Sequence, residues 1–445
     1  MKEITTRVIF IIVCGLGLLL VNCGYLQMTS QRFKMDFLSL HGPTPHELKQ
    51  AHPGQTGILM GRIRGATPPG KYLIILAVPK QFTSRHIADY TILPNPGYYT
   101  LHVPRGNYQI LAFIDGNANA VCEQGEFAGR YSKGDTITVA DCQVIGKLDF
   151  AVSSTGETLY TLPIDLKKAA IEKNVERKSL IVDGTINLDD NLFARQYGAL
   201  GLWNPSQFID SAGVNLYALE KYNRNKIPVL FVHGSGATPR SWASLIDNLD
   251  RQRYQPWFFY YPSGLPLRML ADILYETLQA AHAKYKFDEL AVVAHSMGGL
   301  IVRSYINRYA DMTCQYRLCI FISLATPWGG VDRAKHIPEQ SLVTYPPSWK
   351  DIASDSVFVD TLHVRKMPPE IKFFLLHGIR NGGVLIQDAG DGAIALTSLT
   401  DDRARAEAHA QYTFNETHTS ILTSTAVCNR CAQLLEYIND PGIQD

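Results

Sequence analysis

The segment most able to do chemistry is a serine between small residues. Ser296 lies in the sequence AHSMGG, between an apolar run at 290–294 and a helix-like pattern at 299–309. A strand, a sharp turn and a helix in this order form the setting of a nucleophile elbow, where small neighbours let strand and helix approach closely. Ala294 stands where Gly is usual. We predict that Ser296 is a nucleophile.

A second segment could stabilise the charge that such a nucleophile creates. The sequence VHGSG, residues 232–236, follows another buried-strand pattern. Acyl transfer needs backbone N–H groups directed at the developing oxyanion. We expect one from Met297, the residue after the nucleophile, and the other from Ser235, in the loop after the early strand. For His233 we expect a structural role in the turn.

A serine hydroxyl also needs a neighbouring base and an acid that orients this base. The expected chain order is Ser, acid, His. Asp391, in the tight-turn sequence GDGAI, is the predicted acid, and Asp388 is the alternative. His418, in NETHTS before the last helical pattern, is the predicted base, and His409, in an Ala- and Arg-rich helical pattern, is the alternative. The base would take the proton of Ser296, and no metal or cofactor is required.

A separate group of oxygen-bearing residues has the spacing of a calcium loop. Ligand positions 1, 3, 5, 7, 9 and 12 of such a loop correspond here to Asp115, Asn117, Asn119, Val121, Glu123 and Glu126. Position 6 is Ala120 rather than Gly, and the flanking segments have strand-like patterns. The sequence therefore suggests a structural Ca²⁺ site, with a polar hairpin turn as the alternative.

Two regions with different periodicity must hold these residues. Between 54 and 153, short apolar runs broken by Gly and Pro predict an antiparallel β-sandwich. From 227 onward, apolar runs alternate with helical patterns, which predicts an α/β fold, a mostly parallel sheet with helices on both faces. The segment 154–226 is polar and aromatic and is interpreted as a connector.

The N-terminus is typical of an export signal. Lys2 and Arg7 precede an apolar run at 8–21, which is shorter than the roughly twenty residues of a spanning helix. The sequence LVNC, which ends at Cys23, resembles the lipobox of bacterial lipoproteins, in which the cysteine is lipidated. Asn22 stands where a small residue is usual. We predict a lipoprotein in the cell envelope that faces the periplasm or the cell exterior; the alternative is an uncleaved anchor or a plain signal peptide.

These patterns divide the chain into five segments. They are a signal peptide at 1–22, a tether at 23–53, the sandwich at 54–153, the connector at 154–226 and the catalytic domain at 227–445. Apart from Cys14 and Cys23 in the signal region, six cysteines remain, and an even number in an oxidising compartment predicts disulfides. Proximity along the chain favours the pairs Cys122–Cys142, Cys314–Cys319 and Cys428–Cys431.

Several motifs resemble those of known families. VLFVHGSGATPRSW, VVAHSMGGLIVR, LATPWGG and DGAIALTS resemble bacterial lipases and esterases of the α/β-hydrolase superfamily, and the related lipid deacylases that act on phospholipid and GPI anchors. The resemblance covers 227–435. VPRGNYQILAFID, at 103–115, resembles prealbumin-like or carboxypeptidase-regulatory-like sandwich domains. Together they imply an α/β-hydrolase domain preceded by an all-β, prealbumin-like domain.

The predicted function is a membrane-attached serine ester hydrolase. Its partners would be a lipid or another carboxylic ester, and the membrane that holds its N-terminus. A thioesterase, amidase or acyltransferase could use the same residues. A catalytically inactive surface binding protein is the third hypothesis. The formal net charge is +1, and the sequence has no long run of one charge. A nucleic-acid-binding protein usually has clustered basic residues, so we expect no nucleic-acid partner.

Overall fold

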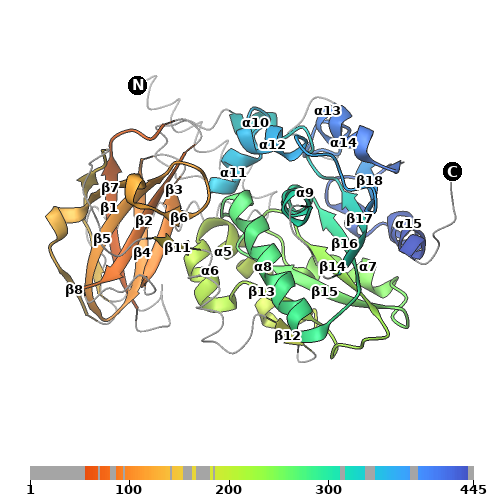
Figure 1. The fold of residues 1–445 in the computed structure, drawn as a ribbon, viewed down its shortest axis with the longest axis horizontal. Helices are drawn as coiled ribbons and strands as arrows, with labels where there is room; N and C mark the ends of the chain where they lie inside the picture. Colours follow the sequence, from red (N-terminus) through yellow and green to blue (C-terminus); the bar gives the residue numbers. More distant parts are fainter. Residues whose placement is uncertain are drawn as a thin grey trace, which may run out of the picture.

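The chain folds into an all-β lobe beside a larger lobe of strands and helices (Figure 1). The computed structural model describes residues 56–68, 71–80, 87–93, 96–140, 143–153, 163–166, 181–183, 186–310, 316–335, 346–380 and 389–438. The predicted signal peptide, tether and Cys23 lie outside these residues. Across the described ranges, no helix is both long and apolar enough to cross a bilayer.

The smaller lobe is built from two sheets. The first contains β1 (Thr56–Arg64), β4 (Tyr98–Pro104), β9 (Val144–Ile145) and β10 (Phe150–Ala151). The second contains β2 (Tyr72–Pro79), β3 (Asp89–Leu93), β5 (Gly106–Asp115), β7 (Phe127–Arg130) and β8 (Ile137–Val139). Leu59 and Leu101 of the first sheet pack with Leu73 and Ala112 of the second in one buried cluster. The lobe is therefore a two-layer sandwich, and its prealbumin-like character stays a prediction.

Smaller elements complete this lobe. They are β6 (Val121–Cys122), the 3₁₀ turns η1 (Gln124–Glu126) and η2 (Tyr131–Gly134), and β11 (Ile164–Asp165), which pairs with β6.

Strand β2 is apolar along almost its whole length because both of its faces are covered. Leu73 and Ile75 belong to the interior of the sandwich. Ile74 and Leu76 belong to a cluster that continues into the core of the larger lobe. Burial on two faces gives a continuous apolar run in place of alternation. The two lobes therefore share a core.

A hydrogen-bonded carboxylate also joins the lobes. The Tyr72 hydroxyl, at the start of β2, donates to the Asp351 carboxylate in the larger lobe. The other Asp351 oxygen accepts the backbone N–H of Leu267 at 2.7 Å. Both Asp351 and Tyr72 are buried. Because Asp351 binds the sandwich and a helix start of the larger lobe together, it fixes how the lobes meet.

The larger lobe is organised around an eight-stranded sheet in the order β12-β13-β15-β14-β16-β17-β18-β19. Its strands are β12 (Ile181–Asp183), β13 (Asn215–Ala218), β14 (Ile227–Val232), β15 (Tyr254–Tyr260), β16 (Glu289–His295), β17 (Arg317–Leu324), β18 (Lys372–Gly378) and β19 (Ala410–Phe414). Every pair is parallel except β13 with β15. Apolar residues fill β14 to β18, as the sequence predicts for strands covered on both faces.

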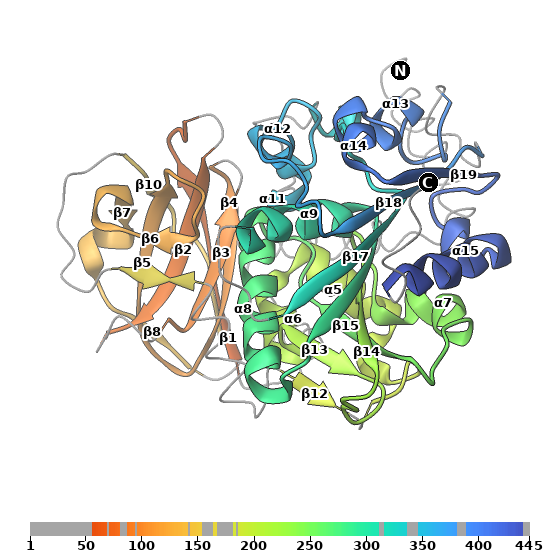
Figure 2. The ribbon, with the colours of Figure 1, turned by 45° about the vertical axis from the view of Figure 1, so that its right-hand side comes forward.

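Helices cover both faces of this sheet. Figure 2 shows α8 and α9 on one side and α7 and α15 on the other. The helices are α5 (Arg195–Trp203), α6 (Pro205–Ala212), α7 (Ala243–Asp247), α8 (Leu267–Tyr285), α9 (Met297–Tyr309), α10 (Asp332–Lys335), α11 (Pro347–Asp351), α12 (Val357–Leu362), α13 (Leu396–Leu399), α14 (Asp402–Glu407) and α15 (Thr425–Leu435). Four 3₁₀ turns accompany them, η3 (Asn191–Phe193), η4 (Pro239–Trp242), η5 (Ser420–Leu422) and η6 (Glu436–Ile438).

The sheet begins earlier in the chain than residue 227, where the α/β fold is predicted to start. The segment 154–226, interpreted as a connector, supplies β12, β13, α5 and α6. Strand β13 has four residues, and its burial on every one of them leaves no alternation to detect. The larger lobe therefore starts well before residue 227.

The expected disulfide between Cys428 and Cys431 does not form. Both thiols are buried and free on helix α15. Side chains three residues apart on a helix are about 5–6 Å apart at Cβ, whereas a disulfide needs about 3.5–4.5 Å. Cys122 and Cys319 are also free, and their expected partners, Cys142 and Cys314, lie outside the described residues.

Candidate active site

Ser296 occupies a sharp turn between strand and helix. Strand β16 ends at His295 and helix α9 begins at Met297, so the serine alone makes the turn. Its φ is 53° and its ψ is −131°, a region that a residue with a side chain rarely adopts. The Ser296 backbone N–H donates to the carbonyl of Leu324 at 2.8 Å, at the end of the neighbouring strand β17. This geometry is that of a nucleophile elbow.

The loop after β14 lies directly against this turn. A Cβ added to Gly234 would be 3.0 Å from the Cβ of Ser296. A Cβ added to Gly298, in the first turn of α9, would be 2.5 Å from the carbonyl oxygen of His233. No larger side chain fits at Gly298 without moving the backbone of the loop. The small residues around Ser296 therefore bring the loop 233–236 close to the serine hydroxyl.

One imidazole connects the serine to an acid. The His418 Nε2 lies 2.9 Å from the Ser296 Oγ, and its Nδ1 lies 2.7 Å from the Asp391 Oδ2. The Asp391 side chain is fully buried, and the backbone N–H groups of Ala393 and Ile394 donate to its Oδ1 at 2.9 and 2.8 Å. The structure thus brings together the three side chains that the sequence predicts as nucleophile, base and acid.

Electrostatics keep the Asp391 carboxylate charged. Burial raises the pKa of Asp391, but the hydrogen bond and charge of His418 and the two backbone donors lower it more, so the net shift is downward. A charged carboxylate at Nδ1 fixes the tautomer in which the Nε2 of His418 is free to accept the serine proton.

The main chain around His418 is held at two points. The His418 backbone N–H donates to the Asp391 carbonyl at 2.9 Å, and the His295 Nε2 lies 2.8 Å from the His418 carbonyl oxygen. Because a carbonyl only accepts, this nitrogen of His295 carries the proton. Burial is the main reason that the pKa of His295 falls to about 3, so the ring stays neutral. His295 lies in the same motif as Ser296, but its residue type and position alone predict no role for it.

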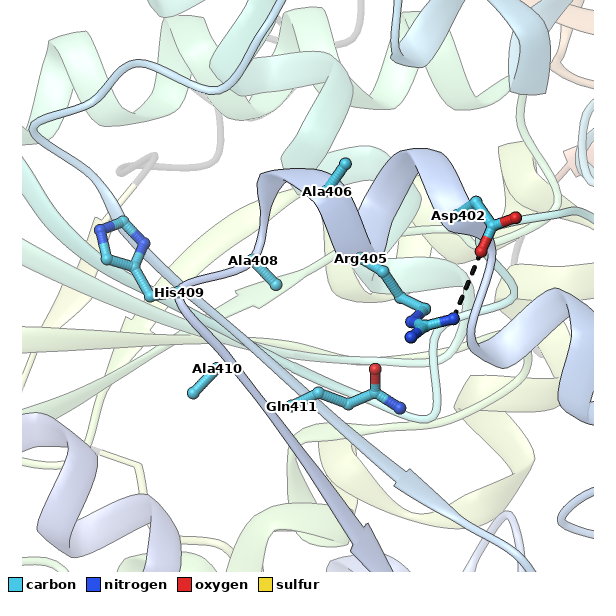
Figure 3. A pocket seen from close by; sticks show the side chains of 7 residues that line it. All are labelled: Asp402, Arg405, Ala406, Ala408, His409, Ala410 and Gln411. Atoms are coloured by element: carbon cyan, nitrogen blue, oxygen red, sulfur yellow. Dashed lines mark hydrogen bonds and ion pairs between the residues drawn. The ribbon is translucent and has the colours of Figure 1, made fainter. Parts of the chain in front are cut away.

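The alternative base lies away from the serine. His409 comes just before the first residue of β19, whereas His418 follows the last, so the two lie at opposite ends of this strand. The His409 Nδ1 accepts the backbone N–H of Phe373 at 3.2 Å. His409 is among the residues that line a pocket of about 490 Å³, and Figure 3 shows its ring pointing away from Arg405 and Gln411. Asp388, the alternative acid, lies outside the described residues.

Two backbone N–H groups near Ser296 suit an oxyanion. Met297 is the first residue of α9, so its N–H has no acceptor four residues earlier. Ser235 is exposed in the loop 233–236, and within the described residues neither amide donates a hydrogen bond. Ser296, His418, Asp391 and these two donors are chemically sufficient for acyl transfer to a serine.

Residues 267–375 match a family model described as "Putative serine esterase (DUF676)". This segment runs from α8 to β18 and contains Ser296, while Asp391 and His418 lie beyond it. A comparison with curated protein sequences finds no match. The family match supports a hydrolase that acts on esters.

Solved structures of lipases and esterases are similar to about half of the chain. The mature Bacillus licheniformis lipase BlEst2 is 17% identical, with 50% of this chain and 97% of that chain covered and a TM-score of 0.40. Aspergillus fumigatus lipase B is 15% identical, with 50% and 56% covered and a TM-score of 0.39. The metagenomic carboxyl esterase MGS0156 is 15% identical, with 49% and 77% covered and a TM-score of 0.36. The geometry of the site, rather than this likeness, carries the functional conclusion.

In the expected calcium loop, two carboxylates accept backbone N–H groups of the loop itself. Asp115 Oδ1 and Oδ2 accept the N–H groups of Asn119 at 3.2 Å and Ala120 at 2.9 Å. The Glu126 carboxylate accepts the N–H groups of Gly116 and Glu123. No group of three or more His, Cys, Asp or Glu side chains in the described part of the chain is arranged to hold a metal ion. These contacts describe a polar hairpin turn, and the Ca²⁺ site stays a prediction.

Proposed function

We propose that this protein is a serine ester hydrolase that cleaves a lipid or another carboxylic ester through an acyl-enzyme. The observation that carries the proposal is the His418 ring, which lies within hydrogen-bond distance of both Ser296 and Asp391. An inactive binding protein would not need a serine, a histidine and a buried carboxylate connected in this order.

The proposed mechanism follows from these contacts. The Ser296 Oγ attacks the ester carbonyl carbon while the His418 Nε2 takes the hydroxyl proton. The N–H groups of Met297 and Ser235 donate to the oxyanion of the tetrahedral intermediate. The intermediate then loses the alcohol, which receives the proton from His418. Water repeats the sequence on the acyl-enzyme, with His418 as base, and releases the acid and the free serine.

The test is a panel of esters with wild type and Ser296→Ala. p-Nitrophenyl esters from acetyl to palmitoyl, a phospholipid, a triglyceride, a thioester and an amide cover the predicted class and its alternatives. We expect ester hydrolysis by wild type and a loss on the order of 10³-fold or more in Ser296→Ala with an unchanged melting temperature. Equal activity in both proteins would contradict the proposal, and faster cleavage of the thioester or the amide would move the function to that class.

We also propose that Cys23 attaches the enzyme to a membrane. The support is in the sequence, where the apolar run 8–21 ends close to LVNC. Several acyl chains together hold a protein firmly, at about 0.8 kcal/mol for each buried CH₂ group. Cys23→Ser should abolish palmitate labelling and leave a soluble enzyme or an unprocessed precursor. A variant that stays in the membrane with its original N-terminus, as wild type would, makes the apolar run itself the anchor.

A further inference from the structure

The loop that carries Ser235 is held by residues outside the proposed triad. Strands β14 and β15 are parallel neighbours, with Val232 beside Phe259, so the loops that follow them lie together. The hydroxyl of Tyr261 donates to the carbonyl of His233. Two residues later, the Oγ of Ser263 accepts the N–H of Gly236 at 2.9 Å. The loop after β15 therefore binds the loop after β14 on both sides of Ser235.

His233 fixes the peptide group that carries the Ser235 amide. Its Nδ1 lies 2.8 Å from the carbonyl oxygen of Gly234, which can only accept, so Nδ1 carries the proton. This carbonyl and the N–H of Ser235 belong to one planar trans peptide and point in opposite directions. A hydrogen bond that holds the carbonyl on one side thereby directs the Ser235 N–H to the other. Ala237 N–H donates to the same carbonyl at 3.3 Å, and Gly236 turns the chain with a φ of 65°.

Tyr261 in turn determines where the His233 ring can lie. The two rings are stacked with centroids 4.1 Å apart and an interplanar angle of 11°. Both residues are buried, with exposed fractions of 2% for His233 and 1% for Tyr261. Burial lowers the pKa of His233 to about 4, so its ring stays neutral at ordinary pH. A neutral ring with a fixed tautomer is a suitable support for a donor that must keep one direction.

We propose that Tyr261 is a positioning residue for the oxyanion hole, which acts through the stacked His233 ring and the His233 carbonyl to direct the Ser235 N–H. This inference rests on the proposed function, because it concerns an amide that matters only if an oxyanion forms. Tyr261 does not touch the reacting atoms. Its loss should therefore lower the stabilisation of the transition state more than the binding of the ester.

The test uses Tyr261→Phe, which keeps the stacked ring and removes the hydroxyl donor. Tyr254→Phe is the matched control, since the Tyr254 hydroxyl also donates to a buried carbonyl, that of Leu435 at 2.8 Å, from the other end of β15. Activity is expressed per active site, counted by stoichiometric labelling with a fluorophosphonate. This normalisation removes any loss that comes only from misfolded protein.

We expect kcat of Tyr261→Phe to fall about 10- to 100-fold with KM changed less than about threefold, because the removal of a whole oxyanion donor costs about 10²–10³. Inhibition by a trifluoromethyl ketone, which forms a tetrahedral adduct, should weaken by a similar factor. Tyr254→Phe should keep the wild-type kcat and inhibition constant. If Tyr261→Phe does not fold, Ser263→Ala, which removes the acceptor of the Gly236 N–H, should show the same pattern with a smaller loss.

Two failures are distinguishable. If wild type is an active esterase and the folded variant keeps its kcat and its ketone affinity, the positioning role is wrong and the proposed function stands. If wild type hydrolyses no ester and takes up no fluorophosphonate, the proposed function itself is wrong. Equal kcat losses in Tyr261→Phe and Tyr254→Phe would also overturn the inference, because the effect would then not depend on the oxyanion loop.

Discussion

Two buried carboxylates, Asp391 and Asp115, are anchored in almost the same way and differ in one partner. Asp115 is the last residue of β5, and Asp391 lies in a turn beyond β18. Each accepts two backbone N–H groups from a tight turn. Asp391 needs only one oxygen for these donors, and its other oxygen meets the imidazole of His418. Asp115 uses both of its oxygens on the backbone.

The pKa values of the two acids move in opposite directions as a result. Burial raises the pKa of Asp115, and its backbone donors offset the effect only in part. Burial also acts on Asp391, but the charge and hydrogen bond of His418 outweigh it and lower the pKa. The imidazole on the second oxygen of Asp391 therefore accounts for the difference between these two carboxylates.

The largest expected effect comes from the base. His418→Ala should lower kcat on the order of 10⁴-fold or more, because the serine loses the group that takes its proton. His409→Ala, a histidine at the opposite end of β19, should leave kcat within about twofold of wild type. Steady-state kinetics with a p-nitrophenyl ester measure both. A large loss in His409→Ala with activity kept in His418→Ala would reverse the assignment.

Replacing the acid should cause the next largest loss of kcat. Asp391→Asn removes the charge that fixes the tautomer of His418 and should cost about 10³–10⁴-fold in kcat. The matched variant Asp388→Asn should cost far less. The same assay compares them, and the reverse ranking would make Asp388 the orienting acid.

Replacing Asp115 should affect stability alone. Asp115→Ala leaves the amides of Asn119 and Ala120 without their acceptor, and should lower the free energy of unfolding by about 2–4 kcal/mol. Because Asp115 lies in the sandwich, kcat measured below the melting temperature should stay at the wild-type value. Denaturant unfolding and ester hydrolysis on the same sample test this. A strong loss of kcat in folded Asp115→Ala would mean that this turn is connected to the active site.

Asp351 is a third buried carboxylate, and its described hydrogen-bond partners are Tyr72 and Leu267 rather than a histidine. Burial raises its pKa from 3.8 to about 6, against the donors Tyr72 and Leu267. A carboxyl with a raised folded pKa favours folding most below its unfolded pKa, and this contribution is lost as the pH rises through about 6. Two pKa units correspond to at most about 3 kcal/mol.

Asp351→Asn, which cannot ionise, therefore provides the pH test. The melting temperature of wild type minus that of the variant should be several degrees larger at about pH 4.5 than at about pH 7.5. A difference that does not change with pH would show that Asp351 keeps the same charge throughout this range.

The sequence was most informative where chemistry and local structure coincide. Ser296 could be predicted because a turn between a strand and a helix needs small residues on both sides. Asp391 and His418 could be predicted because they follow Ser296 in the chain order Ser, acid, His. The sequence does not predict strand β19, because the strand has only five residues and they are at most partly buried at the edge of the sheet. The Ala- and Arg-rich pattern around His409 predicts a helix there, but α14 ends at Glu407 and His409 lies beyond it.

Other features depend on atoms that a residue pattern does not specify. The spacing from Asp115 to Glu126 does not specify that both carboxylates accept backbone N–H groups of the same turn. The support of the Ser235 amide by His233 and Tyr261 joins the ends of two strands through a ring stack. Neither residue has a spacing relation to the other that a motif could record.

Covalent labelling followed by peptide mass spectrometry tests directly whether Ser296 is the nucleophile. A fluorophosphonate reacts with a serine that a neighbouring base activates. We expect one adduct per chain, on the peptide that contains Ser296, and none in Ser296→Ala. An adduct on another residue, or labelling that persists in Ser296→Ala, would contradict the assignment of Ser296 as the nucleophile.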